Sequence, residues 1–325
     1  MNGITYIPKR KITLNEPSAA PPASGGLELG SITQRGDVRV RRIFLVLALV
    51  SVLIMLLIML FLFREGLGLF STVSLKDFFL NREWYPTDDA PDFGILALII
   101  GSLSVTAVSS LIAVPLGVGA ALYLAGIAHH RVREWAKPAI ELLSSLPSVV
   151  LGFVGMVLIA PLMQEWFDIP TGLNILNASM MLALMAIPTI CSISEDALHS
   201  VPREWLEASF ALGATRWETV YLVLLPGALS GLGTAVILGM SRAMGETMVV
   251  LMVAGGAAQI PSSLFDSVRP LPATIAAEMG ETPFGSEHYH ALFAIGITLF
   301  LVTLAFNLVA AYISHRFHQK GSATL

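Results

Sequence analysis

One stretch limits the fold of this chain more than any other: residues 43–63, which read IFLVLALVSVLIMLLIMLFLF without a charged side chain. A helix rises about 1.5 Å per residue, so a run of this length crosses a hydrocarbon core of about 30 Å. Open sheet edges cannot be satisfied in lipid, so membrane-spanning segments of this kind are helices. Five later apolar stretches meet the same criterion: 94–126, 138–161, 175–193, 226–256 and 289–313. The sequence therefore predicts an all-α integral membrane protein with six transmembrane helices.

Composition supports this class. The chain is 55% hydrophobic and 13% charged, against about 25% charged residues in an average soluble protein. The net charge of −4 is mild, and nothing in it indicates a nucleic-acid partner. The lipid bilayer is the environment that the composition requires.

Residues 1–42 differ from the rest, because they are polar and contain EPSAAPPASGG. Such a segment buries too little apolar surface to offset the entropy of ordering, so we expect a disordered tail. The tail is too long for a cleaved signal peptide, which favours an uncleaved anchor at 43–63. Residues 64–93 are then an external segment, and residues 316–325 form a C-terminal tail.

Lysine and arginine predict the orientation, because cytoplasmic loops are enriched in both. Placing the tail inside leaves only Arg64, Lys76, Arg82 and Arg269 outside. The predicted inner segments hold many more: Lys9, Arg10, Lys11, Arg35, Arg39, Arg41, Arg42, Arg131, Arg133, Lys137, Arg203, Arg216, Arg316 and Lys320. Both termini are therefore expected in the cytoplasm.

A mixed-charge stretch, EASFALGATRWETVYLVLLP at 207–226, interrupts the apolar pattern on the predicted cytoplasmic side. Ser200 is expected to cap a helix over 203–211 with Pro202 in its first turn. Gly213 can turn the backbone sharply. A second short helix over 214–223 would follow, until Pro226 opens the next span.

This stretch resembles the EAA loop of permease subunits of ATP-binding-cassette importers. The positions that match are Glu207, Ala208, Gly213, Leu225 and Pro226, while Ser209 and Val223 are mild departures. The resemblance implies that 200–226 is a coupling loop that docks into a groove on a partner ATPase. The alternative is a helix resting on the lipid surface, which usually carries Lys and Arg towards the headgroups. This stretch holds more acidic residues (Glu204, Glu207 and Glu218) than basic ones (Arg203 and Arg216), so docking on a protein is favoured over binding to lipid.

No lysine in the chain follows a glycine directly, so the chain has no Walker A loop. We therefore expect that the chain is not itself an enzyme and that a separate subunit hydrolyses ATP. No cofactor, catalytic residue or metal site is expected either.

The segments IELLSSLPSVVLGFVG, SRAMGETMVVLMVAGG and ATIAAEMGE look like the C-type permease of bacterial phosphate importers. The similarity runs through most of residues 43–315. It implies the MetI-like permease fold, with a core of five helices over 94–315 preceded by one N-terminal helix. It also implies that the chain lies in a bacterial inner membrane, with the external segment 64–93 in the periplasm. The implied partners are a homologous A-type permease, two copies of an ATP-binding subunit and a periplasmic phosphate-binding protein.

Charged residues within the predicted spans are candidates for the substrate pathway, because ionised groups in lipid face a partner or a polar cavity. Arg242 and Glu246 lie four residues apart beside a stripe of small residues, Gly231, Ala235, Gly239 and Ala243. The stripe by itself indicates close helix packing. Arg242 and Glu246 either neutralise each other or line the path, where a guanidinium can bind phosphate. Resemblance to the phosphate permeases favours the path.

Glu141 and Ser148 are the other pathway candidates, because both belong to the predicted span 138–161. Glu141 is an alternative ion-pair partner for Arg242. Ser148 repeats at four residues with Ser144 and Gly152, which is ordinary helix packing, but its hydroxyl could also bind a passing anion. The sequence leaves both alternatives open.

The predicted external segments are acidic and would repel a free anion. We therefore expect Glu278 and Glu281 to belong to a surface on which a binding protein docks. Two rival functions stay open. One is a permease for another oxyanion, such as molybdate or sulfate. The other is an ATP-independent secondary transporter or channel, which would leave the EAA-like loop unexplained.

Overall fold

A computed structural model describes residues 30–322 of the protein, with side chains for residues 40–312. The chain divides into two compact units, Met1–Leu57 and Ile58–Leu325. In chain order the elements are α1 (Gly30–Gly68), the 3₁₀ turn η1 (Leu69–Ser71), α2 (Leu75–Leu80), β1 (Trp84–Tyr85), β2 (Asp92–Phe93), α3 (Leu96–Leu122), the π-helical turn η2 (Tyr123–Ile127), α4 (His130–Ser144), α5 (Ser148–Val154), the π-helical turn η3 (Gly155–Ile159), α6 (Ala160–Phe167), α7 (Ile175–His199), α8 (Arg203–Ala211), α9 (Arg216–Thr219), the π-helical turn η4 (Val220–Leu224), α10 (Leu225–Met244), α11 (Met248–Val253), α12 (Leu271–Glu278) and α13 (Glu287–Ser322).

The described part of the first unit is the beginning of α1. Every side chain from 40 to 57 is exposed, although nearly all of them are apolar. A helix that is apolar on every side suits a lipid environment. The predicted span 43–63 lies within α1, which begins at Gly30. Of the predicted tail, residues 1–29 lie outside the described part of the chain.

Within the described residues, six helices are long and apolar enough to cross a membrane, as predicted. They are Val40–Ser71, Leu96–Ile127, Ser148–Phe167, Ile175–His199, Arg216–Met244 and Glu287–Tyr312. The prediction of an all-α membrane protein is confirmed. One short sheet lies in the described part of the chain: β1 pairs antiparallel with β2, between α2 and α3.

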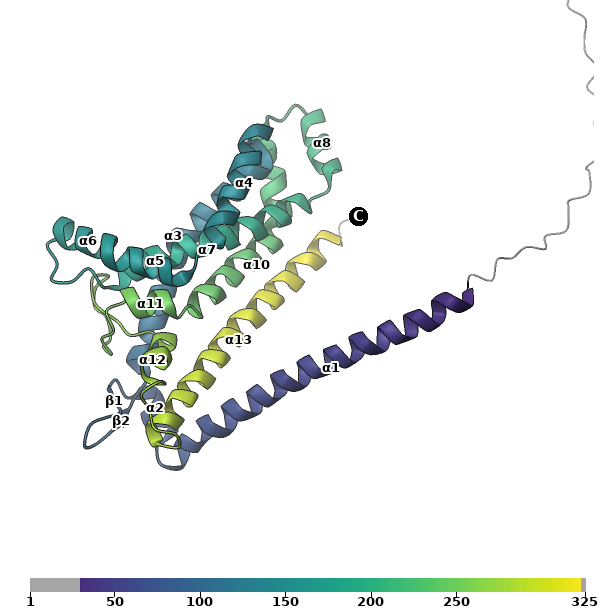
Figure 1. The fold of residues 1–325 in the computed structure, drawn as a ribbon. Coiled ribbons are helices and arrows are strands. Elements are labelled where there is room, and N and C mark those ends of the chain that lie inside the picture. The colour runs from purple at the N-terminus through teal and green to yellow at the C-terminus, as the bar shows by residue number, and fades with distance from the viewer. Residues whose placement is uncertain (1–29, 323–325) are drawn as a thin grey trace, which may run out of the picture. The chain divides into compact units, whose positions relative to one another are not determined.

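Helices α3, α7 and α10 pack together at the centre of the second unit (Figure 1). Glycines allow the close approach. A Cβ on Gly231 would lie 2.4 Å from the Cβ of Ala197, and one on Gly239 would lie 2.4 Å from Ile190. The small-residue stripe of α10 therefore faces α7 of the same chain, in agreement with the packing interpretation.

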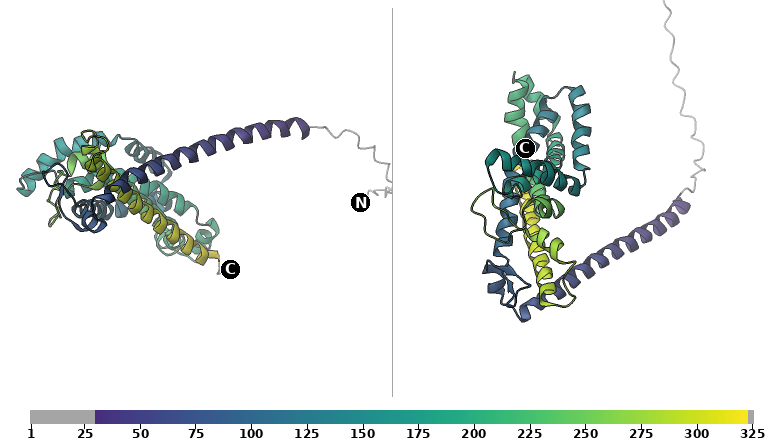
Figure 2. Two further views of the ribbon diagram at one scale, coloured as in Figure 1. Left: turned by 90° about the horizontal axis from the view of Figure 1, so that it is seen from below. Right: turned by 60° about the vertical axis from the view of Figure 1, so that its left-hand side comes forward.

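Helix α13 packs along α10, and its first turns also contact the C-terminal part of α1 (Figures 1 and 2). Phe61 meets Phe293 edge to face, with ring centroids 5.4 Å apart. A Cβ on Gly66 would clash with Ile297. Residues 58–68 are therefore part of the packed second unit.

Two predicted spans are wrong in their boundaries, because each is broken. The stretch 138–161 divides into α4 and α5 at Ser145–Pro147, since a residue before proline avoids helical geometry. The hydroxyls of Ser144 and Ser145 donate to the last carbonyls of α4, each at 2.7 Å. The stretch 226–256 divides into α10 and α11 at Gly245–Thr247. These breaks place α11 against α5.

The second unit has two opposite ends, each with its own polar structure (Figure 1). Helix α8 lies at one end. At the other end lie α2, the β1–β2 hairpin and α12, around a core of Phe78, Trp84, Leu271 and Leu292. The candidate functional groups are divided between these two ends and the breaks in the spans.

Candidate functional site

The elbow, which we define as residues 203–219, consists of α8, a turn at Gly213 and α9. Gly213 has a φ of 86°, in the left-handed region that favours glycine. A Cβ there would meet nothing within 4 Å, so the requirement for glycine comes from the backbone alone. Thr215 and Glu218 then form a complete capping box that starts α9. The helix 203–211 and the turn at Gly213 agree with the prediction.

Two details of the predicted elbow are wrong. Ser200 does not cap α8; its hydroxyl donates to the carbonyl of Ala197, 2.7 Å away, at the end of α7. The helix after Gly213 does not stop before Pro226 but continues from α9 through η4 into α10. Proline would clash with the carbonyl four residues earlier in an α-helix. The wider π turn at Val220–Leu224 accommodates it.

The elbow is tied to the membrane helix that follows it. The hydroxyls of Ser209 and Thr219 are 3.0 Å apart, and Thr219 is buried. A Cβ on Gly227 would lie 3.3 Å from Val201 and 3.5 Å from Trp205. Because these contacts join α8 to α9 and α10, a displacement of the elbow would be passed to α10.

Large apolar side chains of the elbow face outward. Leu212 is 90% exposed and Trp217 is 66% exposed, with Trp205 and Phe210 also exposed. Aromatic residues in such patches are typical of protein interfaces. With Glu204 and Glu207 also exposed on α8, this surface suits a protein groove better than anionic headgroups.

A buried carboxylate lies behind the elbow, and the sequence analysis missed it. Glu195 of α7 has a side chain only 3% exposed, with one oxygen 2.8 Å from Arg133 and the other 3.4 Å from Lys137. His199 lies 3.5 Å from the same carboxylate. A buried carboxylate needs such partners. These ion pairs join α4 to the end of α7, the helix that leads into the elbow.

Arg242 and Glu246, the main pathway candidates, line one small crevice together with Leu182, Met185 and Ala186 of α7. Within the part of the chain whose side chains are described, neither forms an ion pair. The helical spacing that would have paired them is lost, because α10 ends at Met244. Arg242 is exposed and Glu246 is half-buried.

The two remaining pathway candidates belong to different helices. Glu141 lies on α4, where it is exposed, and Ser148 begins α5, where it is half-buried. Neither lines the crevice of Arg242 and Glu246. The expectation that Glu141 and Ser148 share one span is wrong, because the chain breaks at Ser145–Pro147.

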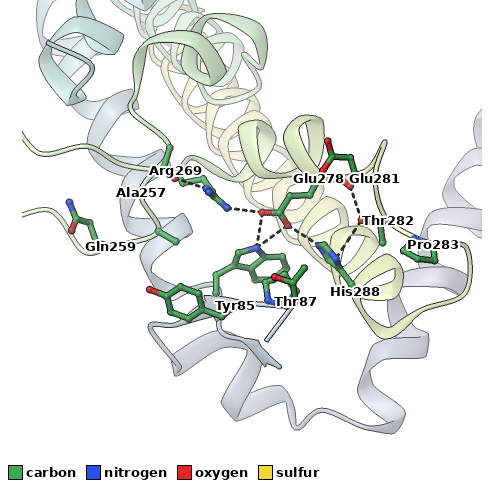
Figure 3. A pocket seen from close by; sticks show the side chains of 14 residues that line it. Tyr85, Thr87, Ala257, Gln259, Arg269, Glu278, Glu281, Thr282, Pro283 and His288 are labelled. Carbon is green, nitrogen blue, oxygen red and sulfur yellow. Dashed lines mark hydrogen bonds and ion pairs between the residues drawn. The ribbon is translucent and has the colours of Figure 1, made fainter. Parts of the chain in front are cut away.

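A cavity of about 610 Å³ opens at the end opposite the elbow (Figure 3). Glu278 makes most of the polar contacts in this cavity. Its carboxylate accepts hydrogen bonds from Arg269 at 2.6 Å and from Trp84 Nε1 at 3.0 Å, and it lies 2.8 Å from His288 Nε2. The side chain is only 18% exposed. Glu278 is thus engaged internally and is not free to bind a docking protein, whereas Glu281 is exposed at the same cavity.

In the described part of the chain, no group of three or more His, Cys, Asp or Glu side chains is placed to hold a metal ion. The candidate ionic and hydrogen-bonding sites described above lie at three places. These are the elbow, the crevice of Arg242, and the cavity of Glu278.

Solved structures with a similar fold are membrane parts of importers. A methionine ABC transporter, MetNI, in an inward-facing conformation matches with a TM-score of 0.53 and 22% identity over 67% of this chain and 93% of that chain. A bacterial ABC transporter that imports alginate matches with a TM-score of 0.56 and 15% identity, over 87% of this chain and 99% of that chain. At these identities, the likeness concerns the fold.

Sequence relatives are closer. A probable ABC transporter permease, YqgH of Bacillus subtilis, is 40% identical over 285 residues, which cover 87% of this chain and 92% of the relative. The phosphate transport system permease protein PstC of Mesorhizobium japonicum is 33% identical over 265 residues, covering 76% of this chain and 80% of the relative. The family described as the binding-protein-dependent transport system inner membrane component matches residues 113–319. Six apolar helices, the MetI-like fold and this match together show that the chain is a multi-pass inner membrane protein and belongs to that family of ABC transporter permeases.

Proposed function

We propose that this chain is one permease subunit of an ATP-driven, binding-protein-dependent importer of inorganic phosphate. It would form half of the translocation pathway, with a homologous second permease subunit forming the other half. Two ATP-binding subunits and a periplasmic phosphate-binding protein would complete the assembly. ATP hydrolysis would take place in those separate subunits.

The observation that carries this proposal is the elbow. It presents exposed apolar side chains at one end of the second unit and is fastened to α10 by Ser209–Thr219 and by Gly227. An importer driven by another subunit needs such a part: a surface that the ATPase can hold and a stiff connection to a membrane helix. A secondary transporter has no use for it.

The orientation follows from the same proposal. With the elbow in the cytoplasm, the cavity of Glu278 faces the periplasm and both termini lie in the cytoplasm. The excess of Lys and Arg on the elbow side supports this arrangement. The exposed Glu281 is then available to a docking binding protein.

Phosphate is the favoured substrate because several relatives at 32–33% identity are phosphate transport system permeases. Arg242 would contact the anion on its path, since it forms no ion pair among the described side chains and a guanidinium matches phosphate geometry. Glu246 would lie beside it in the same crevice. Ser148 and Glu141 would act from separate places along the path, because they belong to different helices. A permease for another oxyanion remains the second candidate.

Coupling is tested by Gly213→Val, with Gly280→Val as the matched control. Both glycines have open space around a Cβ, but only Gly213 has a positive φ. The elbow variant should lose copurification of an ATP-binding subunit and lose ATP-dependent uptake, while the Gly280 variant keeps both. Unchanged copurification with Gly213→Val would contradict the coupling role.

Substrate is tested by phosphate uptake into proteoliposomes that hold the assembled complex. Uptake should be lost in Arg242→Gln while the complex still assembles, and excess unlabelled molybdate or sulfate should compete poorly. Full uptake by Arg242→Gln would remove that residue from the path. Strong competition by molybdate or sulfate would favour the second candidate.

A further inference from the structure

A second cavity, of about 530 Å³, lies between the elbow and the ends of α4 and α7. Its polar lining consists of Arg133, Arg203, Arg216, His199 and the hydroxyl residue Thr219. The rest is apolar, including Leu198 and Leu224. No carboxylate lines it. A lining with three guanidiniums and no acid favours an anionic ligand.

The arginines differ in what they contact. Arg133 donates to Glu195 at 2.8 Å and also contacts His199. Arg203 and Arg216 form no ion pair and no side-chain hydrogen bond with any described residue. The buried acid next to the cavity, Glu195, already pairs with Arg133 and Lys137, and the elbow acids Glu204 and Glu218 do not line it. Two guanidiniums at the cavity are thus free for a ligand.

The lining identifies the chemical class of that ligand. Guanidinium groups bind tetrahedral phosphate oxygens through paired hydrogen bonds, and several of them suit a group that carries more than one negative charge. The cavity holds far more than one oxyanion, and its apolar part can accept the organic portion of a phosphate ester. Basic pockets between membrane helices are typical sites for phosphate-bearing headgroups.

We propose that this cavity binds a phosphate-bearing anion, either inorganic phosphate or the headgroup of an anionic phospholipid. The anion would join Arg203 of α8 and Arg216 of α9 to Arg133 of α4. It would therefore hold the elbow against the helices behind it. The binding stands independently of transport; its effect on coupling rests on the proposed function.

The test uses the full chain, purified without phosphate, and follows amide hydrogen exchange in residues 203–211. One arm adds inorganic phosphate in detergent. The other compares nanodiscs of phosphatidylglycerol with nanodiscs of phosphatidylcholine. Exchange in α8 should slow several-fold with phosphate, which assigns a free anion, or only with phosphatidylglycerol, which assigns a lipid. No slowing in either arm overturns the proposal.

Variants assign the effect to the cavity. The double variant Arg203→Gln/Arg216→Gln should bind about tenfold more weakly for each guanidinium removed. Arg131→Gln is the matched control, because it is an exposed arginine of α4 outside the cavity. Arg203→Lys keeps the positive charge and should weaken binding less than the double variant does. This conservative variant keeps the test valid if the double variant fails to fold. Full protection in the double variant would overturn the proposal.

Arg242→Gln separates the two proposed phosphate sites. Protection of α8 should persist in this variant, because Arg242 lies in a different crevice. Loss of protection in Arg242→Gln would place the ligand there and overturn the proposal. Since no ATPase and no transport enter these measurements, a negative result leaves the importer assignment standing.

Discussion

The two cavities at opposite ends of the second unit hold similar basic groups, yet they differ in one respect. At the hairpin end, Glu278 sits among Arg269, His288 and Trp84 and satisfies all three. At the elbow end, Arg203 and Arg216 line a cavity that no carboxylate shares. Arg269 pairs with Glu278 and stabilises the fold, whereas Arg203 and Arg216 have no such partner among the described residues and are available to a ligand. The comparison teaches that the acid, and not the base, decides the role.

The largest loss of stability is expected at the hairpin end, when Glu278 is replaced. Glu278→Ala would leave a guanidinium, an imidazole and an indole N–H without their acceptor in a mostly buried place. Unpaired buried polar groups are costly, so we expect a loss of about 2–4 kcal/mol in stability. Thermal unfolding in detergent measures it. Glu281→Ala, at the exposed rim, is the control and should change little; equal effects would contradict the comparison.

Glu195→Gln should destabilise less than Glu278→Ala, by about 1–3 kcal/mol. Its side chain is buried, but Arg133 and Lys137 are 37% and 46% exposed and can be hydrated when the charge is lost. The same unfolding assay ranks the two carboxylates. A larger loss at Glu195 would show that the elbow end depends on its acid more than the hairpin end does.

Gly213→Ala should cost about 1–2 kcal/mol, because a residue with a Cβ resists the left-handed backbone of the turn. The cost is local, since open space surrounds the position. Hydrogen exchange should therefore rise in 203–219 and stay unchanged at the hairpin end. A uniform rise across both ends would mean that the elbow is not an independent part.

The smallest effect concerns Asp266, in the loop that joins α11 to α12. The backbone amides of Ser262 and Ser263 donate to its carboxylate at 2.6 and 2.8 Å, and these bonds lower the pKa of Asp266. Because folding lowers this pKa, the ionised carboxylate stabilises the loop at pH values above the pKa of Asp in the unfolded chain, about 3.9. That contribution is lost as pH falls through the folded pKa. In the wild type, amide hydrogen exchange of residues 262–263, corrected for intrinsic rates, should rise as the pH falls through this range. In Asp266→Asn the corrected exchange rate should not depend on pH.

The sequence predicted the number of membrane-spanning helices, the helix 203–211 and the turn at Gly213 correctly. Apolar length predicted all six spans, because hydrophobic thickness is a one-dimensional property of the chain. The left-handed turn at Gly213 followed from the residue type in a helical context. Both features depend on a residue and its neighbours in the chain.

Features that depend on distant parts of the chain were missed or wrong. Arg133 and Lys137 come from α4, and Glu195, far along the sequence, comes from α7. An acidic residue near the end of the apolar run 175–199 was a usable signal that a basic partner lay elsewhere in the chain. The breaks at Ser145–Pro147 and Gly245–Thr247 separated residues that a continuous helix would have joined. Arg242 and Glu246 thus lack the expected helical spacing.

The account depends most on the elbow being the surface that the ATPase holds. Leu212→Cys places a thiol at the most exposed large apolar residue of the elbow, in a chain whose one native cysteine, Cys191, is buried. Phe284→Cys, equally exposed at the hairpin end, is the matched control. In the assembled complex, the thiol at 212 should cross-link to the ATP-binding subunit and react only with cytoplasmic reagents, while the thiol at 284 does neither. Cross-linking to that subunit from 284 and not from 212 would contradict the account.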